Sequence, residues 1–308
     1  MSPTPPGDAV LAIEPESPCP VGEVGGLLSY HLELHLADAV ARVRNSGGIL
    51  FERIASDTAE SLAVELRRIG VRARRFDASI LSGLPRVRRV RAIGRAGDDL
   101  RLQILGGRSF SLGPGDLYAT HVFALPHPAA RRAAADEAAS SKSWMRSLRG
   151  VRALAGRPTR LTPEEKREEV EGRWFQRHHH DLGEDVLLSA RAVKLRNALL
   201  ELGRPLPSLH ATLIAVESAA SFRISQEDLD YSVLEERKTD YSLDNFLLLL
   251  DSLRAFAPAA RMAERLAAFL DTLQPRAILY SGEDEVGRIE RWMQLWARTE
   301  GTEPDLSP

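Results

Sequence analysis

The stretch LADAVARVRNSGGILFERIASDTAESLAVELRRIGVRARRF, residues Leu36–Phe76, decides the fold. Its pattern predicts a helix up to Arg44, a break at Gly47 and Gly48, and a strand over residues 49–54. A second helix is expected up to residue 69, because apolar residues recur there at helical spacing, and a strand over 71–76 completes the run. The apolar face of that second helix consists of Ala59, Leu62, Ala63, Leu66 and Ile69.

Both ends of this second helix carry their own signals. Asp57 has Glu60 three residues later, which is the spacing of a capping pair, so we expect Asp57 to cap the helix. Gly70 follows the last apolar position and tolerates the left-handed conformation that ends helices. Local signals therefore support the helix that periodicity predicts.

The whole chain has 308 residues, which is enough for two domains with separate cores. Hydrophobic residues make up 44% and charged residues 27%, as in ordinary soluble globular proteins. The start, MSPTPPGDAV, lacks the basic and apolar regions of a secretory signal, and no apolar run has the length of a membrane span. Cys19 is the single cysteine, so it forms no internal disulfide. We expect a cytoplasmic protein.

The segment that precedes Leu36 has two possible structures. Residues 10–13 form a short apolar run, typical of a buried strand. From residue 24 to 36, apolar residues alternate with polar ones as in a strand, but several also fit one helical face. In a strand, His31, Glu33 and His35 would share a face and could bind a metal, whereas in a helix they point in different directions.

Residues 8–76 resemble the C-terminal domain of the bacterial ribosomal stalk protein. The resemblance implies the order strand, two helices, strand, helix and strand for a module over residues 8–77. The matching residues are Leu36, Ala39, Val43, Leu50, Ala59, Glu60, Leu62, Leu66 and Gly70.

The function of the stalk family transfers only in part. Clp protease adaptors share the same arrangement, and both families bind proteins. In the stalk family, lysine-rich helices and a Gly-rich turn contact translation GTPases, whereas the corresponding stretch here, GLLSYHLELHLADA, contains no lysine. The resemblance therefore implies a protein-binding module without naming its partner.

Residues 85–125 follow a different pattern, in which short apolar alternations are separated by Gly-rich turns. The turns at Gly97-Asp98 and Gly106-Gly107 predict an antiparallel β-meander of three or four strands. Its first strand is rich in arginine. Arg86, Arg88, Arg89 and Arg91 alternate there with apolar residues.

These four arginines are the candidate polyanion-binding residues, since guanidinium groups bind phosphates. From residue 67 to 108 the chain has 12 Arg against three Asp, whereas from residue 173 to the end it has 16 basic and 22 acidic residues. The arginine-rich strands either meet nucleic acid or dock on the acidic C-terminal half. Few aromatic residues accompany the arginines, which disfavours a stacking platform for single strands.

Residues 126–160 are rich in Ala, Arg and Ser and predict a linker, and residues 161–300 predict a mainly helical domain. A helix is expected to start at Thr162 and to end near His178, His179 and His180. Three consecutive histidines rarely converge on one ion, because their side chains point in different directions. We expect a surface loop there, and a metal site is the alternative.

The last predicted helix, over residues 284–298, carries two tryptophans four residues apart. Trp292 and Trp296 therefore lie together on the helix surface. They pack either in the core or against a partner, because aromatic residues dominate both environments. This pair is the candidate partner face.

Nucleotide-binding, zinc-protease, nucleophile-elbow and kinase motifs are absent from the sequence. We therefore expect an α+β protein that is not an enzyme and has no cofactor. It is a protein-interaction or regulatory protein in one hypothesis, binding through the N-terminal module, the helical domain or both. In the other hypothesis it binds nucleic acid or another polyanion through the arginine-rich strands.

Overall fold

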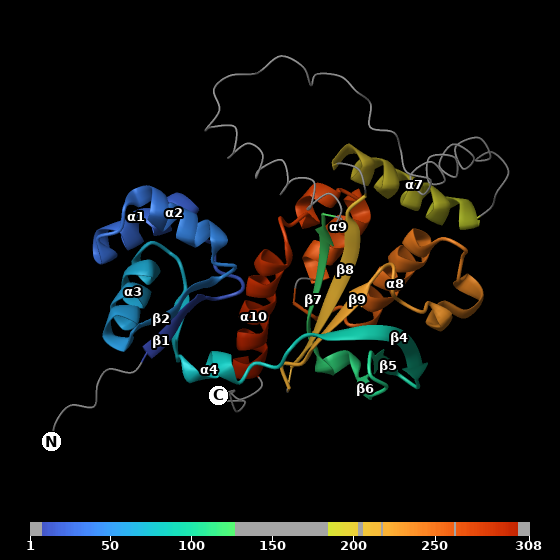
Figure 1. Cartoon of the computed structure of the whole chain (residues 1–308), viewed down its shortest axis with the longest axis horizontal. Helices are drawn as coiled ribbons and strands as arrows, with labels where there is room; N and C mark the ends of the chain where they lie inside the picture. The colour runs from blue at the N-terminus through green and yellow to red at the C-terminus, as the bar shows by residue number, and fades with distance from the viewer. Residues whose placement is uncertain (1–7, 127–183, 203–205, 217, 262, 301–308) are drawn as a thin grey trace, which may run out of the picture.

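The computed structural model describes residues 8–126, 184–202, 206–216, 218–261 and 263–300. They form an α+β fold, as the sequence predicts, with two separate sheets and helices on both sides of each (Figure 1). An N-terminal module holds the smaller sheet, and the rest of the described chain builds the larger one.

The N-terminal module has the predicted order of elements. Its three strands form an antiparallel sheet in the order β2-β1-β3, and its three long helices pack on one face of that sheet. The elements are β1 (Asp8–Ile13), α1 (Val21–Leu32), α2 (Leu36–Asn45), β2 (Ile49–Ala55), α3 (Ser56–Arg68) and β3 (Ala73–Asp77).

The ambiguous segment before Leu36 is helical. Glu33 takes a left-handed conformation with φ of 53° and ends α1, and the Nδ1 of His35 accepts a hydrogen bond from the Ala37 amide at 3.3 Å where α2 begins. His31 lies within α1, so His31, Glu33 and His35 do not form a strand face. The helical alternative is confirmed, and Leu28 is buried on the inner face of α1.

The boundaries of α3 confirm one prediction and correct another. Gly70 has φ of 79°, the left-handed conformation that the sequence predicts there. The prediction that Asp57 caps the helix is wrong, since α3 begins at Ser56 after Ala55, with no side-chain cap. Asp57 instead lies in the first turn, where a carboxylate interacts favourably with the helix dipole.

The larger sheet has six strands in the order β6-β5-β4-β9-β8-β7. The predicted meander accounts for the first three, but the segment expected to follow them leaves the meander and pairs with β8 in the C-terminal region. The strands are β4 (Arg88–Ala96), β5 (Asp99–Ile104), β6 (Ser109–Leu112), β7 (Leu117–Leu125), β8 (Ser208–Ala215) and β9 (Ser221–Ser225).

The burial of β7 explains why this strand does not stay in the meander. All nine of its residues are buried, so the strand needs cover on both faces, which a small meander does not supply. Pairing with β8 covers one edge of the strand, and α9 and α10 contact it as well. The neighbour of β8, strand β9, then pairs in parallel with β4. The larger sheet therefore joins residues 88–125 and 208–225 into one unit.

The remaining helices occupy two layers. Residues of α7, α8 and α9 pack with one face of the six-stranded sheet, and α10 lies between the two sheets (Figure 1). These elements are α4 (Ser79–Ser82), α7 (Glu184–Leu202), α8 (Ser242–Phe256), α9 (Ala263–Thr272) and α10 (Glu283–Glu300), with short 3-10 helices η1 (Pro114–Asp116), η2 (Ser232–Arg237) and η3 (Pro275–Ile278).

Candidate functional site

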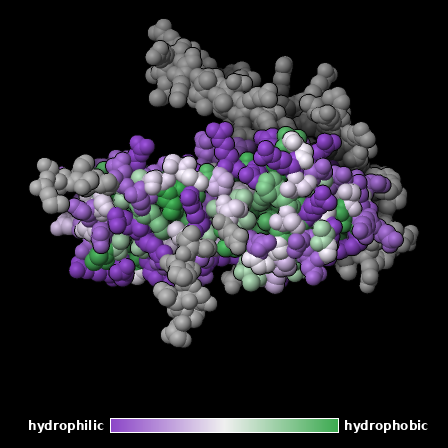
Figure 2. Space-filling view, turned by 90° about the horizontal axis from the view of Figure 1, so that it is seen from below, coloured by the Kyte–Doolittle hydropathy of each residue, from purple (hydrophilic) through white to green (hydrophobic). Residues whose placement is uncertain are grey.

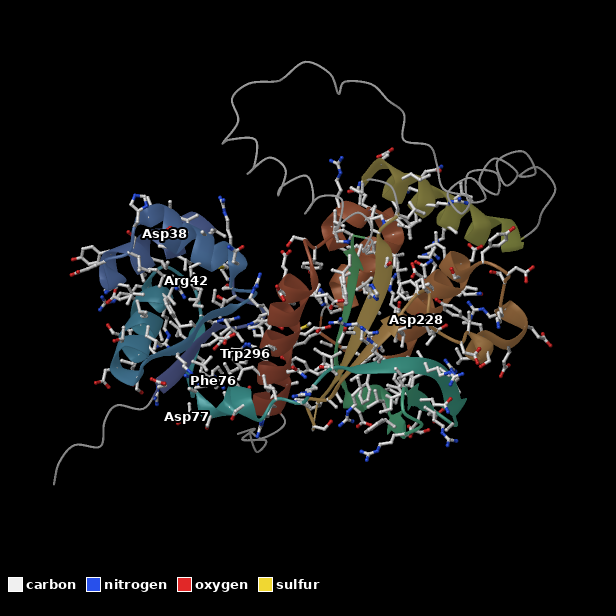
Figure 3. The ribbon with its side chains drawn as sticks, in the orientation of Figure 1. Asp38, Arg42, Phe76, Asp77, Asp228 and Trp296 are labelled. Carbon is white, nitrogen blue, oxygen red and sulfur yellow. The ribbon has the colours of Figure 1, made fainter. Side chains whose placement is uncertain are left out.

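The two tryptophans of α10 face the N-terminal module of the same chain. The indole N–H of Trp292 donates to the Ile13 carbonyl oxygen at 2.7 Å, and that of Trp296 donates to the same oxygen at 3.2 Å. Trp296 is 2% exposed and its ring meets Phe76 edge-on, with centroids 5.3 Å apart (Figure 3). The surface predicted for a partner is therefore covered by the module, because the indoles satisfy a strand-end carbonyl while burying their rings.

Two glycines allow this close contact. A Cβ atom on Gly48 would lie 2.5 Å from the Trp292 Nε1, and one on Gly47 would lie 2.9 Å from the Arg288 Cβ. Both glycines have positive φ, at 59° for Gly47 and 100° for Gly48. The turn at Gly47 and Gly48, where the sequence predicts the end of a helix, therefore also allows α10 to pack closely against the module.

Ion pairs across this contact run opposite to the overall charge asymmetry. Arg291 on α10 pairs with Glu52 on β2 at 2.7 Å, and Arg261 pairs with Glu16 at 2.7 Å. In both pairs the module supplies the acid and the C-terminal region supplies the arginine. The arginines of the basic strands in the larger sheet take no part in these two ion pairs.

The four candidate polyanion-binding arginines do not share one face. Arg86, Arg89 and Arg91 are exposed, whereas Arg88 is half-buried, with its guanidinium 4.5 Å from the Phe110 ring centroid. A guanidinium held over an aromatic ring stabilises the fold and is therefore less available to bind a phosphate. Among the described residues, no ion pair engages any of the four arginines.

A buried polar cluster lies under α10. Arg223 on β9 pairs with Glu290 at 2.7 Å and with Glu283 at 2.6 Å, and the Thr212 hydroxyl donates to Glu290 at 2.5 Å. Glu290 is 1% exposed. The sequence carried a signal for this cluster, because Glu290 interrupts the apolar face of α10.

Histidines and a tyrosine extend the cluster along the sheet. His210 stacks on Phe123 with centroids 5.2 Å apart, and the His121 Nε2 lies 2.9 Å from the Tyr280 hydroxyl. Burial, together with the nearby positive charge of Arg223, lowers the pKa of His210 to about 4, so its ring is neutral at physiological pH. The acids and the arginine of the cluster balance each other's charge, which gives it a structural role.

Described residues of the larger domain line two pockets. A cavity of about 260 Å³ lies between β7, α9 and η3, and the described residues of its lining include His121 and Tyr280 but no Asp, Glu, Lys or Arg. A larger one of about 430 Å³ lies where β4 and β5 meet η2 and α8, and its lining includes Arg95, Glu235 and Arg237. Sequence reasoning did not single out these three residues, because they come from distant segments.

The α1–α2 hairpin carries the most exposed large apolar side chain among the described residues. Tyr30 is 83% exposed and Leu36 is 53% exposed. Figure 3 places Asp38 and Arg42 on the same hairpin, away from Trp296 and α10. The face of the molecule seen from below instead shows separate hydrophobic patches among hydrophilic residues (Figure 2).

The described residues contain no group of three His, Cys, Asp or Glu side chains placed to hold a metal ion. His178, His179 and His180, and the predicted linker over 126–160 apart from residue 126, lie outside the described residues. No helix within the described ranges has the length and apolar character needed to cross a membrane.

Comparison with protein-family models, curated proteins and solved structures found no match to this chain. The resemblance of residues 8–76 to the stalk domain therefore stays a prediction. The arguments for function rest on the surfaces and pockets described above.

Proposed function

We propose that this chain is a non-enzymatic protein-interaction or regulatory protein that binds a protein partner through the α1–α2 hairpin of its N-terminal module. One observation carries the proposal: the module packs its sheet on α10 and leaves Tyr30 and Leu36 exposed on the opposite layer. Large exposed aromatic side chains are typical anchors of protein interfaces.

The surroundings of the hairpin support a protein partner. The exposed residues of α2 include both Asp38 and Arg42, so the surface combines apolar anchors with charges of both signs. An apolar centre with a polar rim is the usual composition of a specific protein interface. A polyanion would instead favour a surface of one sign.

The test compares full-length variants in quantitative capture from an extract of the source organism, followed by binding measurements with the purified captured protein. The variant Tyr30→Asp/Leu36→Asp is expected to lose the partner, because two charges replace the apolar anchors. Val64→Asp is the control, since Val64 is 42% exposed but lies on α3. Equal binding by both variants would refute the proposed surface.

A second candidate function is polyanion binding through Arg86, Arg89 and Arg91. It is favoured by their exposure and by the lack of ion pairs to them within the described part of the chain. Affinity for duplex DNA or RNA is expected to fall steeply as salt rises, because each phosphate contact releases counterions. The absence of binding at low salt would exclude this function.

A further inference from the structure

The pocket of about 430 Å³ combines an apolar wall with charged groups at one site. Its size falls within the range of small-molecule sites, about 300–1,000 Å³. The apolar wall comes from four elements of the larger domain. It consists of Ile93, Leu100, Val233, Leu234, Leu249 and Leu253.

Two arginines from distant segments line this pocket. Arg95 comes from β4 and Arg237 from the end of η2, and both are exposed at the lining. No ion pair to either is found among the described residues. Ser232 and Ser252 belong to the same lining. Guanidinium groups recognise carboxylate and phosphate with two parallel hydrogen bonds, so this pair suits an oxyanion.

Backbone strain lies at the same pocket. Glu235 has φ of 48° and ψ of −122°, a conformation that residues with a side chain rarely adopt, and it interrupts η2. Such conformations persist where the surrounding structure holds them, and they cluster at ligand-binding sites. The segment that carries Glu235 lies beside β4, where the Asp230 amide donates to the Arg91 carbonyl oxygen at 2.8 Å just before η2 begins.

We propose that this pocket binds a small organic oxyanion with an apolar body, its carboxylate or phosphate held by Arg95 and Arg237 and its body packed on the Leu, Ile and Val wall. The smaller cavity beside His121 is a poorer site for such a ligand, because no charged residue is found in its lining among the residues that the structure describes. The proposal does not depend on the protein interaction of the α1–α2 hairpin, which lies in the other domain.

The experiment is calorimetric titration of the full-length protein with 3-phenylpropanoate, with phenyl phosphate, and with the neutral isostere 3-phenylpropanamide. At least one anion is expected to bind about tenfold or more tightly than the amide, and the preferred anion identifies the oxyanion class. Arg95→Gln and Arg237→Gln are each expected to weaken that anion about tenfold. Arg101→Gln removes the same charge from β5, where Arg101 is exposed between the buried Leu100 and Leu102, and is expected to bind like wild type.

Methyl chemical shifts provide a second measurement that needs no variant. The bound anion is expected to shift the methyl signals of Val233, Leu249 and Leu253, which line the pocket. Three outcomes would overturn the proposal: neither anion binds, the amide binds as tightly as the acid, or Arg101→Gln weakens binding as much as Arg95→Gln. Unchanged methyl signals at saturating anion would also overturn it.

Discussion

Arg89 and Arg223 are direct neighbours in the larger sheet, yet their environments differ. The parallel register of β4 and β9 places them side by side on the face toward α10. Arg223 has a side chain that is 14% exposed and contacts two glutamates of α10, whereas Arg89 is exposed. The position of α10 accounts for the difference, because this helix brings its carboxylates over β9.

The comparison separates a structural arginine from one that is available for binding. A buried guanidinium stays charged and loses hydration, and Glu290 and Glu283 offset that loss for Arg223. Arg89 keeps its hydration and needs no partner. Residue type alone therefore does not mark a polyanion site on this sheet.

The largest expected effect is the loss of stability when the buried arginine, Arg223, is replaced. Arg223→Gln leaves Glu290 buried without its cation and is expected to lower the free energy of unfolding by about 3–5 kcal/mol. Arg89→Gln, its neighbour, is expected to change it by no more than about 0.5 kcal/mol. Urea unfolding of both variants measures the difference, and equal losses would contradict the assignment of roles.

The close contact between α10 and the N-terminal module can be tested at Gly48. Gly48→Ala strains a residue with positive φ and places a methyl group against Trp292, so a loss of about 3 kcal/mol is expected. Gly97→Ala is the matched control, because Gly97 also has positive φ but has open space around it. It is expected to cost about 1 kcal/mol, and a similar loss in both variants would mean that contact with α10 contributes nothing.

The two hydrogen bonds that share the Ile13 carbonyl oxygen provide a second test of the contact between α10 and the module. Trp292→Phe and Trp296→Phe each leave one indole on the Ile13 carbonyl and are each expected to cost about 1 kcal/mol. The double variant leaves that carbonyl without either donor. Its loss is expected to exceed the sum of the single losses by about 1 kcal/mol in a double-mutant cycle, and strict additivity would argue against a shared role.

Asp244 is the buried acid to compare with Glu290. It is 3% exposed, its Oδ1 has no hydrogen-bond partner among the described residues, and burial raises its pKa to about 6. Because the folded state then holds the proton more tightly, this group stabilises the fold below about pH 4, and that contribution is lost as pH rises through 6. Asp244→Asn is expected to be about 1 kcal/mol more stable than wild type at pH 7.

The measurement is the difference in unfolding free energy between Asp244→Asn and wild type from pH 4 to pH 7. His210 acts in the opposite direction, since its lowered pKa removes stability as pH falls from 6.5 toward 4, but this contribution cancels in the difference. The difference is expected to grow with pH between 4 and 6. A difference that stays constant across this range would show that Asp244 ionises normally.

Part of the candidate sites was predictable from local pattern. The α1–α2 hairpin and the arginines of β4 lie in segments that the sequence singled out, because periodicity and charge are local properties. The pocket around Arg95 and Arg237 was not predictable, since about 140 residues separate the two arginines and only the β4–η2 contact joins them. The pairing of Arg223 with Glu290 depends likewise on the path of α10.

The sequence by itself determined the helices and strands of residues 36–76, the three strands β4 to β6 and the last helix, α10. Apolar spacing and glycines act within a few residues of the backbone they shape, as Gly70 does at the end of α3. Only the tertiary structure decided that β7 joins β8 and that α10 buries its tryptophans against Ile13. An apolar strand or an aromatic face requires cover, but its sequence does not specify which distant segment supplies it.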